Sequence, residues 1–326
     1  MAFASTVVLE QHEISDTLVE RLQGLFASPQ YRPPVLPTVA IQIMELSQRP
    51  SITFDEVVGV LEKDPLLAAR VLSTASSALY AGMSQVTSLK QASVRLGLKT
   101  LRDLVLEAAM NLRVFRVPGY EEPMERLRRH SSVTAQIARV VCKRASVEAE
   151  HAFICGLLHD VGYAAGILAL VENKKPGDRL QYEDMAPAVA AYHEEATALV
   201  GKLWKLHAPI LDVISRHHRL GPSAPPLVPV LIVSEQLAYE LDAGISPVVW
   251  PEGLDEGQPP KPVPGTPDAN PPELLAEAKS LLRIDEAALE DLRAEALEVY
   301  LKMPDVKPPP AKGGAAAAPA AAQKKR

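Results

Sequence analysis

Apolar residues recur at helical spacing along almost the whole chain, and this periodicity limits what the chain can fold into. Leu18, Leu22 and Leu25 mark one face of a first helix over residues 15–27. No segment shows the strict alternation of apolar and polar residues that is typical of a half-buried strand. We therefore predict an all-α fold. The later part of the chain is expected to form helices over residues 124–145, 149–159, 161–172, 185–205, 208–217 and 227–242.

Helix start signals support this interpretation in the first third of the chain. Thr53, Asp64 and Ser88 each precede an apolar helical run, and Asp64 is followed by a proline. Such side chains cap the free N–H groups of a first helical turn, and proline fits the first helical position. Gly97 is expected to end the helix that Ser88 begins, before a second helix through Leu101.

Changes in composition divide the chain into segments. With 326 residues, 47% of them hydrophobic, the chain is long enough to bury a sizeable core. Residues 246–272 are too rich in proline to be helical, and the end of the chain is an alanine, proline and lysine tract that is typical of disorder. We expect an extension at 1–29, a main domain at 30–242 with parts 30–115 and 124–242, a loop at 246–272, helices at 273–303 and a tail at 304–326.

A His-Asp doublet, His159-Asp160, interrupts the apolar run over residues 153–162. An imidazole beside a carboxylate is costly to bury unless both are paired or bind a metal. The doublet belongs to a group of histidines that holds five of the eight in the chain, namely His130, His159, His193, His217 and His218. The grouping predicts either a metal site or a buried hydrogen-bond network.

Five motifs together resemble the HDOD family in the family's order, over roughly residues 30–240. They are residues 32–49, 61–72, 77–80, 88–97 (Ser-Leu-Lys-Gln-Ala followed by Arg-Leu-Gly) and 156–162 (Gly-Leu-Leu-His-Asp-Val-Gly). The resemblance implies an all-helical signalling module in which an N-terminal helical subdomain packs on an HD-like core. That core is related to HD-type metal-dependent phosphohydrolases, whereas HDOD proteins are mostly regarded as bacterial signalling or scaffold components.

The resemblance also implies a set of metal ligands. The HD pattern is a histidine, a His-Asp doublet and a later aspartate, which His130, His159 and Asp160 match in part. Glu235 stands at the last position, and its extra methylene moves the oxygen by about 1.5 Å, whereas ligand distances hold to about 0.2 Å. In the related HD-GYP phosphodiesterases further histidines bind a second metal, and His193, His217 and His218 resemble them. These ligands suit Fe, Mn, Co, Ni or Zn.

Two departures argue against hydrolysis of a cyclic dinucleotide. Tyr163 stands where those phosphodiesterases usually carry a lysine, and a Gly-Tyr-Pro motif is absent. Plainer interpretations also stay open: His217-His218 as the cap of a helix C-terminus, and Glu194-Glu195 as a solvated face. We expect His151 and His207 to be structural.

Charge and hydropathy limit the partners. A net charge of −6 argues against non-specific nucleic-acid binding, which needs a basic excess. The two helices over residues 88–106 superficially match a helix-turn-helix with Lys90, Arg95, Lys99 and Arg102, but their leucine periodicity favours ordinary helix pairing. We find no apolar stretch of the ~18–20 uncharged residues that a membrane span requires and no secretory signal. Cys142 and Cys155 are expected in the core, and the protein in the cytoplasm.

The sequence thus favours a cytoplasmic bacterial signalling or regulatory protein that acts by binding a partner protein or a nucleotide-like ligand. A groove lined by the histidines would hold the ligand, and the N-terminal helices would meet the partner. The alternative is a metal-dependent phosphohydrolase that acts on a nucleotide or cyclic dinucleotide, with His130, His159, Asp160 and Glu235 holding one metal and His193, His217 and His218 a second.

Overall fold

The computed structural model describes residues 17–47, 49, 51–80, 86–175, 177–178, 180–245 and 270–303, and within these ranges the chain contains helices and no strand. The all-α prediction is confirmed for this part. Residues 17–27 are helical, and the helices that follow are α2 (Thr38–Ser47), α3 (Phe54–Leu61), α4 (Pro65–Ala75), α5 (Leu89–Arg113), α6 (Glu121–Ala145), α7 (Ala152–Leu158), α8 (Val161–Glu172), α9 (Tyr182–Leu203), α10 (Ala208–Ile214), α11 (Leu227–Glu240), α12 (Pro272–Leu282) and α13 (Glu286–Lys302). Most of the expected N-terminal extension, the proline-rich loop up to residue 269 and the tail lie outside the described residues.

The predicted helix starts have the expected capping contacts. The Thr53 side chain accepts a hydrogen bond from the Glu56 backbone N–H while the Glu56 side chain accepts one from Thr53, which is a capping box. Asp64 and Ser88 likewise accept from the third residue of their helices. Gly97 has φ +72° and ψ 162°, a conformation that favours glycine, and it breaks α5 into two helical stretches.

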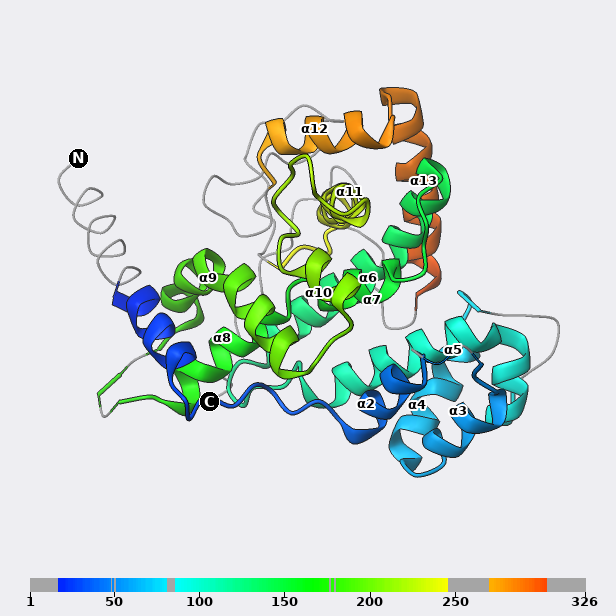
Figure 1. Cartoon of the computed structure of the whole chain (residues 1–326), viewed down its shortest axis with the longest axis horizontal. Coiled ribbons are helices and arrows are strands. Elements are labelled where there is room, and N and C mark those ends of the chain that lie inside the picture. Colours follow the sequence, from blue (N-terminus) through cyan, green and yellow to red (C-terminus); the bar gives the residue numbers. More distant parts are fainter. Residues whose placement is uncertain are drawn as a thin grey trace, which may run out of the picture.

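The N-terminal helical part consists of α2 to α5, with α2, α3 and α4 packed around α5 (Figure 1). The second stretch of α5 presents Leu101, Leu104 and Val105 to the core. Its far end contacts α7, which joins this part to the rest of the molecule. The arrangement is an N-terminal helical subdomain packed on a larger helical core.

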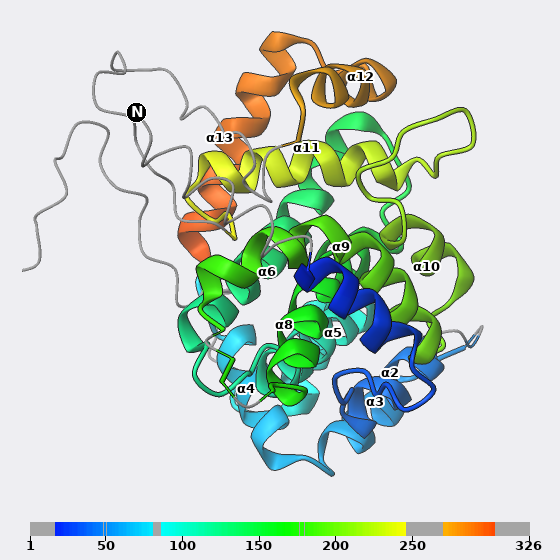
Figure 2. The same cartoon turned by 90° about the vertical axis from the view of Figure 1, so that its left-hand side faces the viewer.

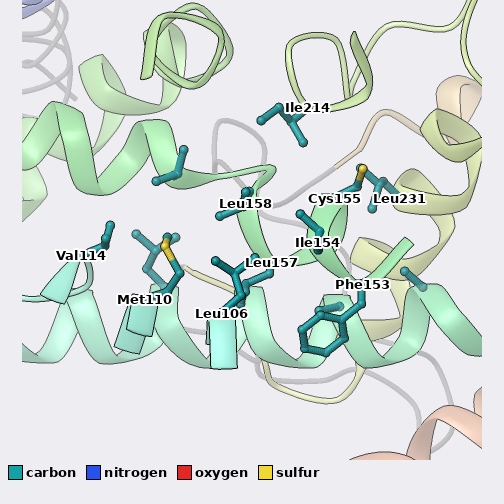
Figure 3. Packing of buried hydrophobic residues seen from close by; sticks show 14 of the residues in the cluster. Leu106, Met110, Val114, Phe153, Ile154, Cys155, Leu157, Leu158, Ile214 and Leu231 are labelled. Atoms are coloured by element: carbon teal, nitrogen blue, oxygen red, sulfur yellow. The ribbon is translucent and has the colours of Figure 1, made fainter. Parts of the chain in front are cut away.

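The histidine-bearing part, α6 to α11, is built around the short helix α7. Helix α6 packs on α7 and α11, and α5, α10 and α11 also contact α7. Helix α8 packs on α9 beside them (Figure 2). Figure 3 shows Leu157 of α7 facing Leu106 and Met110 of α5, and Cys155 facing Leu231 of α11. Cys155 and Cys142 are free and buried, as expected for core residues.

The C-terminal amphipathic segment is two helices that complete the core. Arg283 adopts a left-handed conformation with φ 55°, which ends α12, and Asp285 then caps α13. Helix α12 packs on α11, and α13 packs on α6, with Leu292 fully buried. At the other end of the chain, Phe26 stacks near Tyr192 of α9, with ring centroids 5.5 Å apart, so residues 17–27 also join the histidine-bearing part.

By length and composition alone, residues Ala152–Glu172 could cross a membrane. Asp160 lies inside them, so they do not contradict the expectation that no uncharged stretch has the length of a membrane span. They form α7 and α8, with the break at His159-Asp160 between them, and 89% of their most apolar window is buried inside the protein. The interior of the fold therefore accounts for their hydropathy.

Candidate metal centre

The His-Asp doublet lies at the junction of α7 and α8. His159 is the C-cap residue that follows α7, and Asp160 stands immediately before α8. A glycine on each side lets a neighbouring helix approach this junction. A Cβ on Gly156 would lie 2.6 Å from Cα of Ala135 on α6, and a Cβ on Gly162 would lie 2.1 Å from the carbonyl oxygen of His193 on α9. The motif around the doublet thus admits the two helices that carry His130 and His193.

The structure brings all seven candidate ligands into one cluster. Helices α6, α9 and α11 contribute His130, His193 and Glu235, and the turn after α10 contributes His217 and His218. Six of the seven are at most 8% exposed, and the His218 side chain is 24% exposed. The cluster is therefore a buried polar core rather than a surface patch.

One set of atoms gathers around Asp160 Oδ2. The Nε2 atoms of His130 and His159 lie 3.2 Å apart, and they are 3.4 and 3.1 Å from this oxygen. Glu235 Oε1 lies 3.5 Å from His159 Nε2. The longer glutamate side chain thus reaches the position where the pattern has an aspartate.

A second set gathers around the other oxygen of the same carboxylate. The Nε2 atoms of His193 and His217 lie 3.2 Å apart, and they are 3.6 and 3.2 Å from Asp160 Oδ1. His218 also offers a nitrogen within 4.8 Å of the other ligand atoms of this set. Asp160 therefore stands between two groups of histidines with one oxygen directed to each.

Hydrogen bonds fix the orientation of four rings. Nδ1 of His159, His193 and His217 lies 2.8, 2.5 and 2.8 Å from the backbone carbonyl three residues earlier, and Nδ1 of His130 lies 3.0 Å from the carbonyl of Ala243. A carbonyl oxygen only accepts, so each Nδ1 carries a proton. In a neutral ring the Nε2 lone pair is then free, and it points into the cluster.

This cluster fits divalent metal better than it fits a closed hydrogen-bond network. Facing Nε2 lone pairs at 3.2 Å repel one another unless a cation lies between them. Asp160 Oδ1 and Glu235 Oε1 are buried and accept no hydrogen bond. A metal with bonds of about 2.1 Å holds adjacent ligand atoms roughly 3.0–3.4 Å apart in octahedral or tetrahedral geometry, close to the separations in both sets.

Burial and charge set the protonation of the histidines in opposite directions. Burial lowers the pKa of His193 to about 4 and also lowers the pKa of His217. Burial is also the largest single influence on His159 and lowers its pKa, but the charge and hydrogen bond of Asp160 together with the charge of Glu235 raise the pKa of this imidazole overall. For His218, the charges of Glu235 and Asp160 and the contact with Asn270 likewise raise the pKa against the effect of burial. Two rings are thus ready to bind metal at neutral pH, while two others bind protons more tightly than usual.

Tyr163, at the place of the expected lysine, is 2% exposed, and its ring stacks on His193 with centroids 4.7 Å apart. His217 does cap α10, since its Nδ1 donates to the carbonyl of Ile214, and the same contact turns its Nε2 inward. Capping and ligand orientation are therefore compatible. His151 and His207 lie away from the cluster as a ring pair 5.8 Å apart.

The solvated-face interpretation is wrong for Glu194. Its carboxylate accepts from the backbone N–H of His218 and from Arg219, and the side chain is 12% exposed. Glu195 is half exposed and also pairs with Arg219. Glu194 thus holds the turn that carries two candidate ligands.

Two polar residues of the site escaped sequence reasoning. Thr197, fully buried, accepts from the Gly162 N–H and donates to the His159 carbonyl, which ties the junction to α9. Its spacing of four residues from His193 places both on one helix face, a signal that was available. Asn270 contacts His218 and Glu235, and nothing in the sequence around it points to the site.

The helix-turn-helix alternative has no support at Arg102. This side chain is buried and binds Asp103 and Glu150 instead of facing solvent. Lys99 also lies 3.7 Å from Glu150. The two stretches of α5 are an ordinary packed helix pair.

Solved structures share this fold. An HDOD domain protein of unknown function from Geobacter sulfurreducens is 21% identical with a TM-score of 0.57, and the match covers 87% of this chain and 98% of that one. A protein from Shewanella amazonensis, provisionally named a metal-dependent phosphohydrolase, is 18% identical with a TM-score of 0.61, over 87% of this chain and 99% of that one. A protein from Marinobacter aquaeolei, provisionally named a signal transduction protein, is 22% identical with a TM-score of 0.53, over 89% and 65%.

A search of the curated proteins finds no match. The family model of the HDOD domain matches residues 34–220, more than half of the chain, and this range contains every candidate ligand except Glu235. The resemblance inferred from the five motifs is confirmed. This chain belongs to the HDOD family.

Proposed function

We propose that this protein is a cytoplasmic signalling protein that binds divalent metal at a buried two-metal centre and acts by binding a partner. The observation that carries the proposal is Asp160, whose two oxygens each face a pair of histidine Nε2 lone pairs. First-row metals such as Fe, Mn, Co, Ni or Zn suit these nitrogen and oxygen ligands. Helices α6 to α11 meet at the ligands, so metal binding would stabilise their arrangement.

The N-terminal helical part supports the binding role. Several of its large apolar side chains are exposed instead of buried, including Val35, Leu66 and Val94 at 78, 62 and 70%. Exposed apolar groups on one part of a molecule favour contact with another protein. The partner surface expected on the N-terminal helices therefore stays our proposal, and a nucleotide-like ligand is the alternative partner.

Closure of the centre favours a metal-dependent binding protein over an enzyme. Six of the seven ligands are buried, the Tyr163 ring stacks on His193, and the ion pairs of Asp160 and Glu235 are with histidines. One cavity between α4, α5 and α6 and two cavities beside α10 are lined by other residues. A phosphoryl substrate would need both an entrance and cationic groups for its oxygens.

A phosphohydrolase that acts on a nucleotide or cyclic dinucleotide is the second candidate. Asp160 belongs to both sets of ligands, and a carboxylate shared in this way favours a two-metal enzyme. One structural neighbour is provisionally named a metal-dependent phosphohydrolase. Two bound metal ions would activate water and stabilise the charge of an in-line phosphoryl transfer. In this case Asp160 would hold both ions, and the protonated Nδ1 atoms would keep the imidazoles oriented.

The test is metal content combined with turnover. The protein is purified without chelators, transition metal is quantified per chain, and hydrolysis of a panel of mononucleotides, cyclic dinucleotides and aryl phosphates is measured. The double variant His159→Ala/Asp160→Ala is compared with His207→Ala, a control histidine outside the cluster. We expect two equivalents of metal in the wild type and in the control, and none in the double variant.

Metal without turnover supports the signalling protein, and metal-dependent turnover supports the phosphohydrolase. A wild-type protein that carries no metal and takes up none in titration would refute both.

A further inference from the structure

Asn270 lies outside residues 34–220 but inside the candidate metal centre. It is 5% exposed and stands just before α12. Its side-chain oxygen lies 2.9 Å from His218 Nδ1, and its side-chain nitrogen lies 2.9 Å from Glu235 Oε2 and 3.4 Å from the carbonyl of Ile232. A single carboxamide thus contacts one candidate ligand of each set.

The contact with His218 completes a pattern among the five histidines. The other four rings each donate their Nδ1–H to a backbone carbonyl, and three of these carbonyls belong to the residue three positions earlier. For His218 the acceptor is the Asn270 side chain. The contact with Glu235 identifies the oxygen and the nitrogen of the Asn270 carboxamide, because only the NH₂ group can donate to the Glu235 carboxylate and to the Ile232 carbonyl.

We propose that Asn270 is a positioning residue that makes His218 a metal ligand. Its oxygen holds the proton on Nδ1, which leaves the Nε2 lone pair of His218 for the set of Asp160, His193 and His217. This inference rests on the proposed metal centre. Asn270 lies after residues 34–220, so the inference gives the C-terminal segment a role in the metal centre. Helix α12 follows Asn270 and packs on α11, the helix that carries Glu235.

Asn270 therefore couples the C-terminal helices to the second metal. Outer contacts of this kind orient a ligand and typically change metal affinity by about 10–100-fold. If Asn270 only filled space, its replacement would alter stability and leave the coordination of the second metal unchanged. The two roles differ in metal affinity and in the spectrum of the bound ion.

The experiment is a Co²⁺ titration of the metal-free protein, followed by the visible absorption of the bound ion and by competition with a chromophoric chelator. It compares Asn270→Ala, His218→Ala and the double variant. Asn173→Ala, an amide at the end of α8, is the control. Asn270→Ser replaces the alanine variant if that variant does not fold.

We expect the wild type and the control to bind two equivalents. Asn270→Ala and His218→Ala should each weaken the second equivalent about 10–100-fold and change its spectrum. The double variant should be no weaker than the weaker single variant to within about threefold, because both changes remove one interaction.

Unchanged affinity and spectrum in Asn270→Ala would overturn the inference while the metal centre stands, and so would additive losses in the double variant. A wild type that binds no Co²⁺ would refute the metal centre itself, and the role of Asn270 with it.

Discussion

Two buried carboxylates, Asp103 and Asp160, differ in how their surroundings satisfy them. Asp103, on α5, is contacted by Arg102 and Arg139, and Arg102 is also held by the side chain and carbonyl of Glu150. Every group in this cluster faces a group of opposite charge or a hydrogen-bond acceptor. Asp160, by contrast, faces imidazole nitrogens whose protons are on the far side of the ring. In the Asp103 cluster every buried acceptor has a donor, whereas in the Asp160 cluster carboxylate oxygens face the lone pairs of imidazole nitrogens.

The two clusters differ in whether their own hydrogen bonds and ion pairs satisfy every buried acceptor. Buried polar groups are normally paired, so orphaned acceptors need an explanation. The Asp103 cluster ties α5 to α6 and to the turn before α7, and its charges need no ligand. The Asp160 cluster needs a cation to compensate its inward lone pairs. Burial alone would not have distinguished them, because both carboxylates are almost fully buried.

The largest effect on folding is expected at the Asp103 cluster. Asp103→Ala would leave Arg102 buried without its carboxylate, and breaking a buried pair in this way costs about 3–5 kcal/mol. Urea unfolding of the metal-free protein measures the loss, and metal stoichiometry should stay that of the wild type. Asp291→Ala, which removes an exposed pair with Arg144, is the control and should change stability by less than about 1 kcal/mol. Loss of metal in Asp103→Ala would contradict the separation of the two clusters.

The next effect is the stabilisation by metal at the Asp160 cluster. A ligand that binds only the folded state at a free concentration of about 100 times its Kd raises the free energy of unfolding by about 2.7 kcal/mol. We expect this gain when Zn²⁺ is returned to chelator-treated protein, measured by urea unfolding. Asp160→Asn keeps the shape but removes the shared charge, and it should abolish the gain. A gain of equal size in that variant would place the metal elsewhere.

Close helix approach at the doublet gives a smaller effect. Gly162→Ala would push α8 away from α9, because its Cβ would lie 2.1 Å from the His193 carbonyl oxygen. Overpacking of this kind costs about 1–3 kcal/mol, and metal affinity should fall with it. Gly59→Ala in α3 is the matched change in the N-terminal part, where nothing lies within 4 Å of the new Cβ. It should stabilise by about 0.5–1 kcal/mol, and thermal unfolding compares the two.

The pH dependence of metal binding sharpens the comparison further. The pKa values of His159 and His218 are raised above 6.5, so protonation of these two rings stabilises the metal-free fold. This stabilisation is fully present below pH 6.5 and is lost as the pH rises through the pKa values of the folded protein. Metal must displace those protons. Affinity for Zn²⁺ should therefore rise with pH by up to about tenfold, or about 1.4 kcal/mol, per unit for each proton displaced. Titrations at several pH values between about 6 and 8 measure this, and a pH-independent affinity would contradict it.

Local rules predicted the helices well, because caps and apolar spacing act within a few residues. Asp64, Ser88 and Gly97 all do in the structure what their types indicate. The boundary errors are one to a few residues at helix ends such as α9, which begins at Tyr182 instead of 185. The doublet His159-Asp160 was likewise predicted to separate two helices, and the structure has α7 and α8 on either side of it.

The seven candidate ligands were chosen from residue type and family pattern, and the structure gathers all of them. Their tautomers were not predictable, because they depend on carbonyls such as that of Ala243, which is far from His130 in the chain. The reach of Glu235 was also undecided, since helix position and side-chain length together set the place of its oxygen. Asn270 was missed because its segment lies beyond the motifs.

The sequence by itself determined the helical class, the family and the chemistry available to the site, because periodicity, capping and motif order are local properties. Only the tertiary structure decided that one carboxylate faces two groups of histidines, and that Asn270 returns to meet His218 and Glu235. These are contacts between residues distant in sequence, and their geometry depends on helix packing through Gly156 and Gly162 to within fractions of an ångström.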